Sequence, residues 1–474
     1  MAAGGTKRDT KPFKPEEARN IVESLQKPAV FCNMVSDWPA RQWDVQRLSE
    51  ILDGKPIEFR IGRRKLNKVP QFETQCEYVK ATLEEFLVWV HGGSNVLPEQ
   101  FSNFPRAQYW AYADYKYIAR LLEDKAELFQ DLMWSDFGFP GRDGRDSTLW
   151  IGSEGASTPC HLDCYGCNLV LQVQGRKRWH LFPPEDTSFL YPTRIPYEES
   201  SVFSKVNVVN PDVKMFPQFG RAKPHIVTLH PGQVLFVPRH WWHYVESLDP
   251  ISVSMNSWIE LAEDDEARVS EALTRTAVYA LKSAENLADA GSWLNPTEVN
   301  IMSHETNLRY LNLAVQACNS KPYLPLSPSP NDGTSPARRS SSNSPKKRKR
   351  ESSKVFPASE RDPVGDESAI PFGPHLLPVG TAHAGSGGSG CVSCDSEQCE
   401  GPLDGDDVEL THCRGRTGLS IGCVAAGCDG RLSSGGGDGG SEDGLTTDDL
   451  LECLVHPDVI RLATRILLDR QSSR

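Results

Sequence analysis

The chain has 474 residues, of which 38% are hydrophobic, so it exceeds one average domain and can bury a sizeable core. Its formal net charge of −12 argues against a protein that wraps nucleic acid with its whole surface. The N-terminal residues are polar and basic, unlike a signal peptide, and no apolar run is long enough to span a bilayer. We therefore expect a protein of the cytoplasm or also the nucleus, without membrane contact or direct nucleic-acid binding, whose 13 cysteines are reduced thiols rather than a disulfide framework.

Composition divides the chain into a folded body and a tail. All eleven Trp residues lie within 1–320, whereas 325–445 is rich in Gly, Ser, Pro and Asp, a composition typical of disorder. The expected parts are a flexible N-terminus (1–24), an α/β lead-in (25–120), a central domain (121–285), a helical extension (286–320), a disordered tail (321–445) and a C-terminal helical element (446–474).

The first part of the body alternates strand-like and helix-like patterns. Thr82-Leu-Glu-Glu is a capping box that predicts the start of an amphipathic helix. The other elements expected here are strands at 29–34, 57–61 and 109–117 and helices at 44–52 and 121–133.

Short β runs between Gly and Pro dominate the segment from 149 to 260. The predicted strands are 149–153, 168–174, 177–182, 225–229, 233–238 and 251–260. Many short strands at this spacing indicate a mainly β protein built as a sandwich or barrel, of which the jelly-roll cupin is one version. We expect helices to follow at 261–285 and 307–318.

Residues 447–470 break the polar composition of the tail. They carry acids in the first turn and apolar residues at helical spacing, and Pro457 is expected to divide them into two helices. The pair could pack against the body, or it could serve as a docking helix for a partner.

A His-x-Asp pair stands in the central stretch TPCHLDCYGCNLVLQVQGRKRWHLFPP (158–184). His161 and Asp163 are two residues apart, so on a strand both side chains project from one face. His243 follows a predicted strand, in PRHWWHYVES. Two His and one carboxylate leave open positions on a metal and suit Fe(II) oxygenases, although zinc would tolerate the same ligands. Taken alone, the His-x-Asp pair would favour a different explanation, in which His161 is a loop or turn residue after Pro159.

Lys177 supplies a second signal. In the predicted strand 177–182 it shares a face with Trp179 and Leu181, while Arg178 and His180 point the other way. A buried lysine needs an anion, and the distal carboxylate of 2-oxoglutarate would provide one. The alternative is an edge lysine whose ammonium reaches solvent.

Together these blocks resemble a known family. The series HLD…N…QxxGxKRWxLFPP, then PGxxLFVPxxWWHxVES and a strand with Asn256, is similar to the JmjC and cupin-like protein hydroxylases, above all the asparaginyl hydroxylases. The resemblance covers roughly residues 25–285. It implies a double-stranded β-helix with flanking helices, bound Fe(II) and 2-oxoglutarate, and hydroxylation of a protein or peptide side chain.

The resemblance also assigns residues. The implied iron ligands and catalytic centre are His161, Asp163 and His243. The implied 2-oxoglutarate site is made of Lys177, Thr158, Asn168, Asn256 and Tyr112, the last chosen from four tyrosines in YWAYADYKY. The spacing from the His-x-Asp pair to Asn168 is one residue longer than in the asparaginyl hydroxylases.

Several other motifs can be explained either by a structural role or by a specific function. Cys160, Cys164 and Cys167 near the ligands are expected to pack rather than to ligate metal, and His240 to sit in a turn. The basic run 345–350 reads either as a nuclear import signal or as a solvated charge run. The tail cysteines lack the regular CxxC pairs of a zinc site.

Three functions remain open from the sequence. The first is a protein hydroxylase, the second is a non-catalytic adaptor with the same fold, and the third is a JmjC histone lysine demethylase. The full sequence further resembles a vertebrate JmjC protein. This resemblance implies a small heat-shock protein of the 27 kDa type as a partner, and a role in the stress response.

Overall fold

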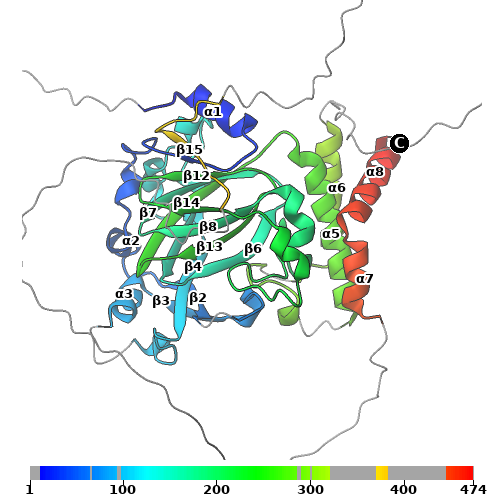
Figure 1. Cartoon of the computed structure of the whole chain (residues 1–474), viewed down its shortest axis with the longest axis horizontal. Coiled ribbons are helices and arrows are strands. Elements are labelled where there is room, and N and C mark those ends of the chain that lie inside the picture. Colours follow the sequence, from blue (N-terminus) through cyan, green and yellow to red (C-terminus); the bar gives the residue numbers. More distant parts are fainter. Residues whose placement is uncertain are drawn as a thin grey trace, which may run out of the picture. The chain divides into compact units, whose positions relative to one another are not determined.

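The computed structural model describes residues 11–64, 67–92, 98–285, 290–298, 301–320, 370–382 and 445–472. Two antiparallel sheets form a jelly roll, with helices around them (Figure 1). Residues 388–446 cluster as a separate unit and, apart from 445 and 446, lie outside the described residues.

The larger sheet has nine strands, and every pairing in it is antiparallel. In spatial order they are β15 (Leu376–Pro378), β1 (Ala29–Phe31), β12 (Val234–Val237), β7 (Cys167–Gln174), β14 (Ile251–Ile259), β5 (Thr148–Ser153), β4 (Tyr109–Tyr117), β2 (Ile57–Arg63) and β3 (Glu77–Ala81).

The smaller sheet has six strands and carries the His-x-Asp pair on a central strand. In spatial order they are β11 (His225–Leu229), β8 (Lys177–Phe182), β13 (Trp242–Ser247), β6 (Ser157–Asp163), β10 (Ser201–Ser204) and β9 (Pro192–Glu198). The two inner faces leave the space between the sheets in which the candidate site lies.

The largest hydrophobic core lies between the nine-stranded sheet and the N-terminal helices. These helices are α1 (Pro15–Ser24), α2 (Val45–Leu52), α3 (Leu83–His91) and the single turn α4 (Ile118–Leu121). The 3-10 turns are Pro39–Gln42, Glu73–Gln75, Glu99–Phe101, Ala126–Asp131, Trp134–Phe137, Gly144–Asp146, Pro184–Phe189, Pro217–Arg221 and Ala290–Ser292. No helix of the described part is both long and apolar enough to cross a membrane.

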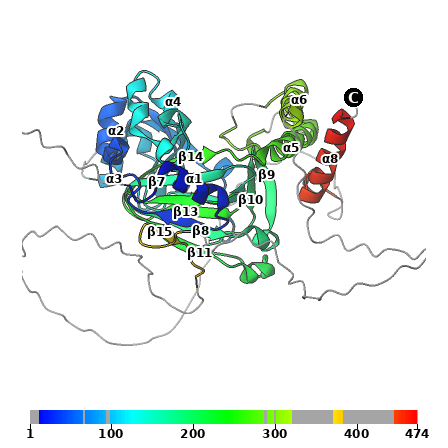
Figure 2. The ribbon, with the colours of Figure 1, turned by 90° about the horizontal axis from the view of Figure 1, so that it is seen from above.

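A second helical layer is built from α5 (Asp264–Glu285), α6 (His304–Ser320), α7 (Thr447–Leu454) and α8 (Pro457–Ser472). Figures 1 and 2 both show the C-terminal helix α8 alongside α5, although more than 170 residues separate them in the chain. Lys282 Nζ donates to Asp448 Oδ1 at 2.8 Å, and the hydroxyls of Ser270 and Thr464 lie 3.0 Å apart. Packing against the body is thus the reading that the contacts support, and Pro457 begins α8 as expected.

The sequence predicted several elements correctly. Thr82 caps α3 with the expected capping box, since its hydroxyl accepts from Glu85 N and Glu85 bonds back to Thr82 N. The strand at 109–117 and the strand beginning at Lys177 have the expected bounds.

Three expectations differ from the structure. Residues 121–133 form no continuous helix; tertiary contacts, including a hydrogen bond from Trp43 Nε1 to Asp131 Oδ2 (3.0 Å), outweigh the helical pattern. Within 1–24, α1 is ordered because Pro15 starts it and Ala18, Ile21 and Val22 are buried on one face.

The third difference lies inside the expected tail. The short apolar run at 376–378 forms β15, pairs with β1 and buries Leu376 completely. The rest of 321–445, including the basic run 345–350 and the tail cysteines, falls almost entirely outside the described residues.

Candidate functional site

The His-x-Asp pair and the distal histidine meet on neighbouring strands. His161 and Asp163 lie on β6, and His243 on β13 is the register partner of His161. One ligand atom from each residue can be chosen so that all three lie within 4.8 Å of one another. His161 is therefore a strand residue, and the loop alternative is wrong.

Main-chain hydrogen bonds fix the orientation of both imidazoles. His161 Nδ1 lies 2.9 Å from Pro159 O, and His243 Nδ1 lies 3.0 Å from Trp241 O. A carbonyl only accepts, so in the neutral form of each ring Nδ1 carries the proton and Nε2 has the free lone pair. Metal-binding histidines typically donate such a hydrogen bond from the nitrogen that does not bind the metal.

The contacts of Asp163 and the pKa of His161 both favour the form of the site that binds a metal. Trp258 Nε1 donates to Asp163 Oδ2 at 3.2 Å, while Asp163 Oδ1 lies 3.9 Å from His161 Nε2. Burial, followed by the nearby His243, lowers the pKa of His161 to about 4. At neutral pH His161 is thus uncharged, which is the form that binds a metal.

Neighbouring candidate ligands are directed elsewhere. His240 has a positive φ of 63° and its Nε2 lies 2.9 Å from Cys164 O, so it occupies a turn, as expected. Within the described part, the metal-capable group contains His161, Asp163 and His243 and no cysteine. Cys160 is buried in a hydrophobic cluster, as the packing interpretation predicted.

The triad opens into a cavity of about 600 Å³ between the sheets. All eight residues chosen from the sequence line this cavity: Tyr112, Thr158, His161, Asp163, Asn168, Lys177, His243 and Asn256. The six-stranded sheet contributes the triad, Thr158 and Lys177, and the nine-stranded sheet contributes the rest.

Lys177 is 2% exposed, so the alternative of an ammonium that reaches solvent is wrong. Its Nζ donates to Ser254 Oγ at 2.7 Å and to Tyr112 Oη at 3.1 Å. Among the described residues no carboxylate forms an ion pair with it, and burial lowers its pKa to about 7. An ammonium in this position needs an anion from outside the chain.

A β-bulge brings Thr158 onto the face of His161. Residues three apart on a regular strand point to opposite faces, but the β6–β13 register shifts between His161 and Thr158. The Thr158 hydroxyl then reaches the phenol of Tyr112, the tyrosine that also touches Lys177.

The two asparagines are joined to each other. Asn256 Nδ2 donates to Asn168 Oδ1 at 2.9 Å, and Trp150 Nε1 donates to Asn256 Oδ1 at 2.7 Å. Asn168 is the register partner of Trp258 on β14, and both residues line the cavity. The longer spacing before Asn168 therefore does not move it out of the cavity.

Some residues of the site were not chosen from the sequence. Ser254 was missed, although it shares the face of Asn256 on the same predicted strand. Arg60 and Asp114 form a buried ion pair at 2.6 Å that backs Tyr112. An arginine inside the apolar run IEFRIG of β2 was the available signal for this pair.

Comparisons with known proteins agree with this geometry. The profile of the family described as Cupin-like domain matches residues 15–264. The chain is 53% identical to the HSPB1-associated protein 1 homolog of Danio rerio, over 98% of both chains. It is 53% identical to HSPB1-associated protein 1 of Rattus norvegicus, over 98% of this chain and 95% of that protein.

More distant similarity reaches another group of proteins. Lysine-specific demethylase 8 of Xenopus tropicalis is 29% identical over 242 residues, which cover 49% of this chain and 48% of that protein.

Proposed function

The chain belongs to the Cupin-like domain family, and from this premise we propose that it is an Fe(II)- and 2-oxoglutarate-dependent oxygenase that hydroxylates a protein side chain. The observation that carries the proposal is Lys177, a buried ammonium without a carboxylate partner among the described residues, in the same cavity as the metal triad. A site that binds only a metal would not explain why the chain buries an ammonium group, which is energetically unfavourable without an anion.

The residues present fit both groups. His161 Nε2, His243 Nε2 and Asp163 would hold Fe(II), since two imidazoles and one carboxylate are the facial ligands of non-haem oxygenases. Lys177 and Tyr112 would hold the distal carboxylate of 2-oxoglutarate, and Thr158, Asn168 and Asn256 would line its remaining surface.

When bound, Fe(II) and 2-oxoglutarate supply with O2 the oxidation of a C–H bond to an alcohol, with release of succinate and CO2. The chain positions these reactants and excludes water from them. Both imidazoles are held in one tautomer by main-chain carbonyls, and Asp163 by Trp258. The site is thus arranged before the reactants bind, which lowers the cost of ordering it.

Succinate formation tests the proposal directly. Protein purified without oxygen is given Fe(II), 2-oxoglutarate and O2, and we expect succinate from the wild type and none from His161→Ala. His240→Gln is the matched control, because this histidine lies beside the site but outside the triad. Wild-type protein that neither binds iron nor forms succinate above the level of His161→Ala would overturn the proposal and leave the adaptor function.

The other products of the reaction separate hydroxylation from demethylation, because succinate forms in both. Oxidation at an ordinary carbon leaves a product 16 Da heavier, whereas oxidation of an N-methyl group releases formaldehyde. The likeness to a protein named as a lysine-specific demethylase makes the second reading worth testing. We propose hydroxylation, and formaldehyde release from methylated peptides would overturn that choice.

We propose in addition that the chain binds a small heat-shock protein of the HSPB1 type and acts in the stress response. The name of the close relatives supports this partner, and α8 offers exposed apolar side chains at Leu462 and Ile466. Capture of purified HSPB1 should be lost on Leu462→Glu with Ile466→Glu and kept on Arg461→Glu. Equal capture by both variants would exclude this surface.

A further inference from the structure

The hairpin of β9 and β10 forms one wall of the cavity that holds the metal triad, and it contributes the carboxylate of Glu198 to the lining. Ser201 on β10 is the register partner of Asp163 on β6, and Glu198 on β9 is the register partner of Ser201. Side chains of directly opposed residues in antiparallel strands lie on one face. Glu198 therefore faces the same cavity as Asp163, two strands away, which is about 10 Å.

Glu198 is buried, and among the described residues it forms no ion pair with a Lys, Arg or His. It is 8% exposed, and its carboxylate accepts a hydrogen bond from the Asn295 amide. Burial, with the nearby Glu73, raises its pKa well above the usual range. A carboxylate held in this way is stabilised by a cation that enters the cavity.

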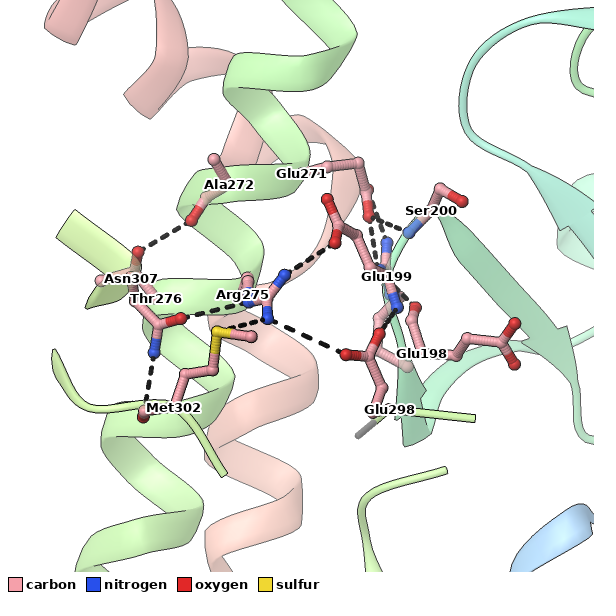
Figure 3. Close-up of polar contacts among 11 residues, drawn as sticks. Glu198, Glu199, Ser200, Glu271, Ala272, Arg275, Thr276, Glu298, Met302 and Asn307 are labelled. Atoms are coloured by element: carbon pink, nitrogen blue, oxygen red, sulfur yellow. Dashed lines mark hydrogen bonds and ion pairs between the residues drawn. The ribbon is translucent and has the colours of Figure 1, made fainter. Parts of the chain in front are cut away.

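The neighbouring carboxylates of Glu199 and Glu298, by contrast, lie close to the guanidinium of Arg275. Arg275 Nη1 lies 2.7 Å from Glu199 Oε2, and its Nη2 lies 3.8 Å from Glu298 Oε2. In Figure 3 Glu199 is directed toward Arg275 on α5, whereas the carboxylate of Glu198 points away from that helix. The helical layer thus neutralises the acids around the hairpin and leaves Glu198 for the cavity.

The same network holds the hairpin turn in place. Arg194 and Glu271 form a buried ion pair at 2.6 Å. The main-chain N–H of Ser200 donates to Glu271 Oε2 at 3.0 Å, and that of Glu199 donates to Glu298 Oε1 at 2.8 Å. Glu198 is therefore presented by a fixed turn, as a recognition residue requires.

Aromatic side chains complete this part of the cavity. Tyr115 has a positive φ of 50°, in a bulge of β4 that interrupts the register with β5. Its ring lies 4.5 Å from that of Trp150, and its hydroxyl hydrogen-bonds with Glu198. Aromatic faces beside a carboxylate are a favourable environment for a cation.

We propose that the substrate side chain is cationic, a lysine or arginine of a polypeptide, and that Glu198 binds its charged end. A long side chain bound in this way presents its methylene groups toward the triad while its charge lies at the hairpin. The inference rests on the proposed function and names its substrate class. It excludes a neutral amide side chain such as asparagine as the preferred substrate.

The test measures binding rather than turnover. Full-length protein is loaded with Mn(II) and 2-oxoglutarate under argon and mixed with fluorescent peptide pools that have random flanks and one fixed central residue. The central residues are Lys, Arg, citrulline, Gln and Asn. By fluorescence polarisation we expect the Lys or Arg pool to bind at least about tenfold more tightly than its neutral counterpart. Glu198→Gln should reduce this preference to less than about threefold.

A matched variant and two further measurements make the result decisive. Glu154→Gln removes a half-exposed carboxylate outside the cavity and should keep the full preference. The Tm and Mn(II) affinity of Glu198→Gln show that the variant is folded. Equal binding of charged and neutral pools, no binding of any pool, or tighter binding of spermidine than of the peptides would overturn the inference. Succinate formation would be unaffected by these outcomes, so the proposed function is judged separately.

Discussion

The imidazoles of His161 and His243 lie with their ring centroids 4.2 Å apart, and each donates from Nδ1 to a main-chain carbonyl two residues earlier in the sequence. Two protonated rings at this distance would repel each other in a buried site. A divalent cation avoids this repulsion, because it binds neutral imidazoles and would satisfy His161, His243 and Asp163 together.

Metal binding should stabilise the protein. At a free Mn(II) or Co(II) concentration of one hundred times the Kd, linkage predicts a gain of about 2.7 kcal/mol in the free energy of unfolding. We expect a rise in Tm for the wild type and for His240→Gln, and none for His161→Ala or Asp163→Ala. An equal rise in all four proteins would place the metal elsewhere.

Stability of the metal-free protein should depend on pH through His161. Its pKa falls from about 6.5 in the unfolded chain to about 4 in the folded one, so the unfolded state binds the proton first as pH falls. The contribution is complete above pH 6.5 and is lost between about pH 6.5 and 4, on the order of 3 kcal/mol. Urea unfolding across this range should give a flatter profile for His161→Gln than for the wild type, and parallel profiles would contradict the assignment.

The sequence predicted the parts of this site that depend on local periodicity. His161 and Asp163 share a strand face because they are two residues apart, and Lys177 is buried beside Trp179 because alternation places it there. All eight chosen residues line one cavity because the jelly roll joins their strands in register.

What the sequence did not reveal depends on irregular backbone and on distant pairing. The bulge in β6 changes which residues share a face with His161, and the positive φ of Tyr115 re-aims a tyrosine within the predicted strand 109–117. Glu198 becomes a cavity residue through its register with Ser201 and Asp163, in a segment where no strand was predicted. Register across a sheet is set by packing and turns, which single-strand periodicity does not encode.

Replacing Lys177 should raise stability and abolish cosubstrate binding. Its folded pKa of about 7 lies below that of an unfolded lysine, so the cost of burying the charge is complete below pH 7 and is relieved as pH rises toward 10. We expect Lys177→Met to be more stable than the wild type by about 1–4 kcal/mol at pH 6 without ligand. Calorimetry should show no binding of 2-oxoglutarate to this variant. A variant that is destabilised, or that still binds, would contradict the assigned role.

Removing one partner of the Arg194–Glu271 ion pair should lower the free energy of unfolding more than replacing both partners with apolar residues. Both side chains are buried, and their atoms lie 2.6 Å apart between β9 and α5. Glu271→Leu leaves a buried guanidinium without its carboxylate and should lower the free energy of unfolding by about 3–5 kcal/mol. Arg194→Met combined with Glu271→Leu removes both charges, and the loss should be smaller than for Glu271→Leu alone.

Chemical unfolding of the wild type, Arg194→Met, Glu271→Leu and the double variant measures the coupling between the two residues. Additive losses would show that the pair does not hold α5 to the hairpin. The double variant also tests the hairpin itself, since Ser200 N loses its acceptor when Glu271 is replaced. A turn that loosens should present Glu198 less well, so the preference for cationic peptides should fall even where stability is restored. Full preference in a destabilised single variant would instead show that other contacts, such as Arg275 with Glu199, suffice to fix the turn.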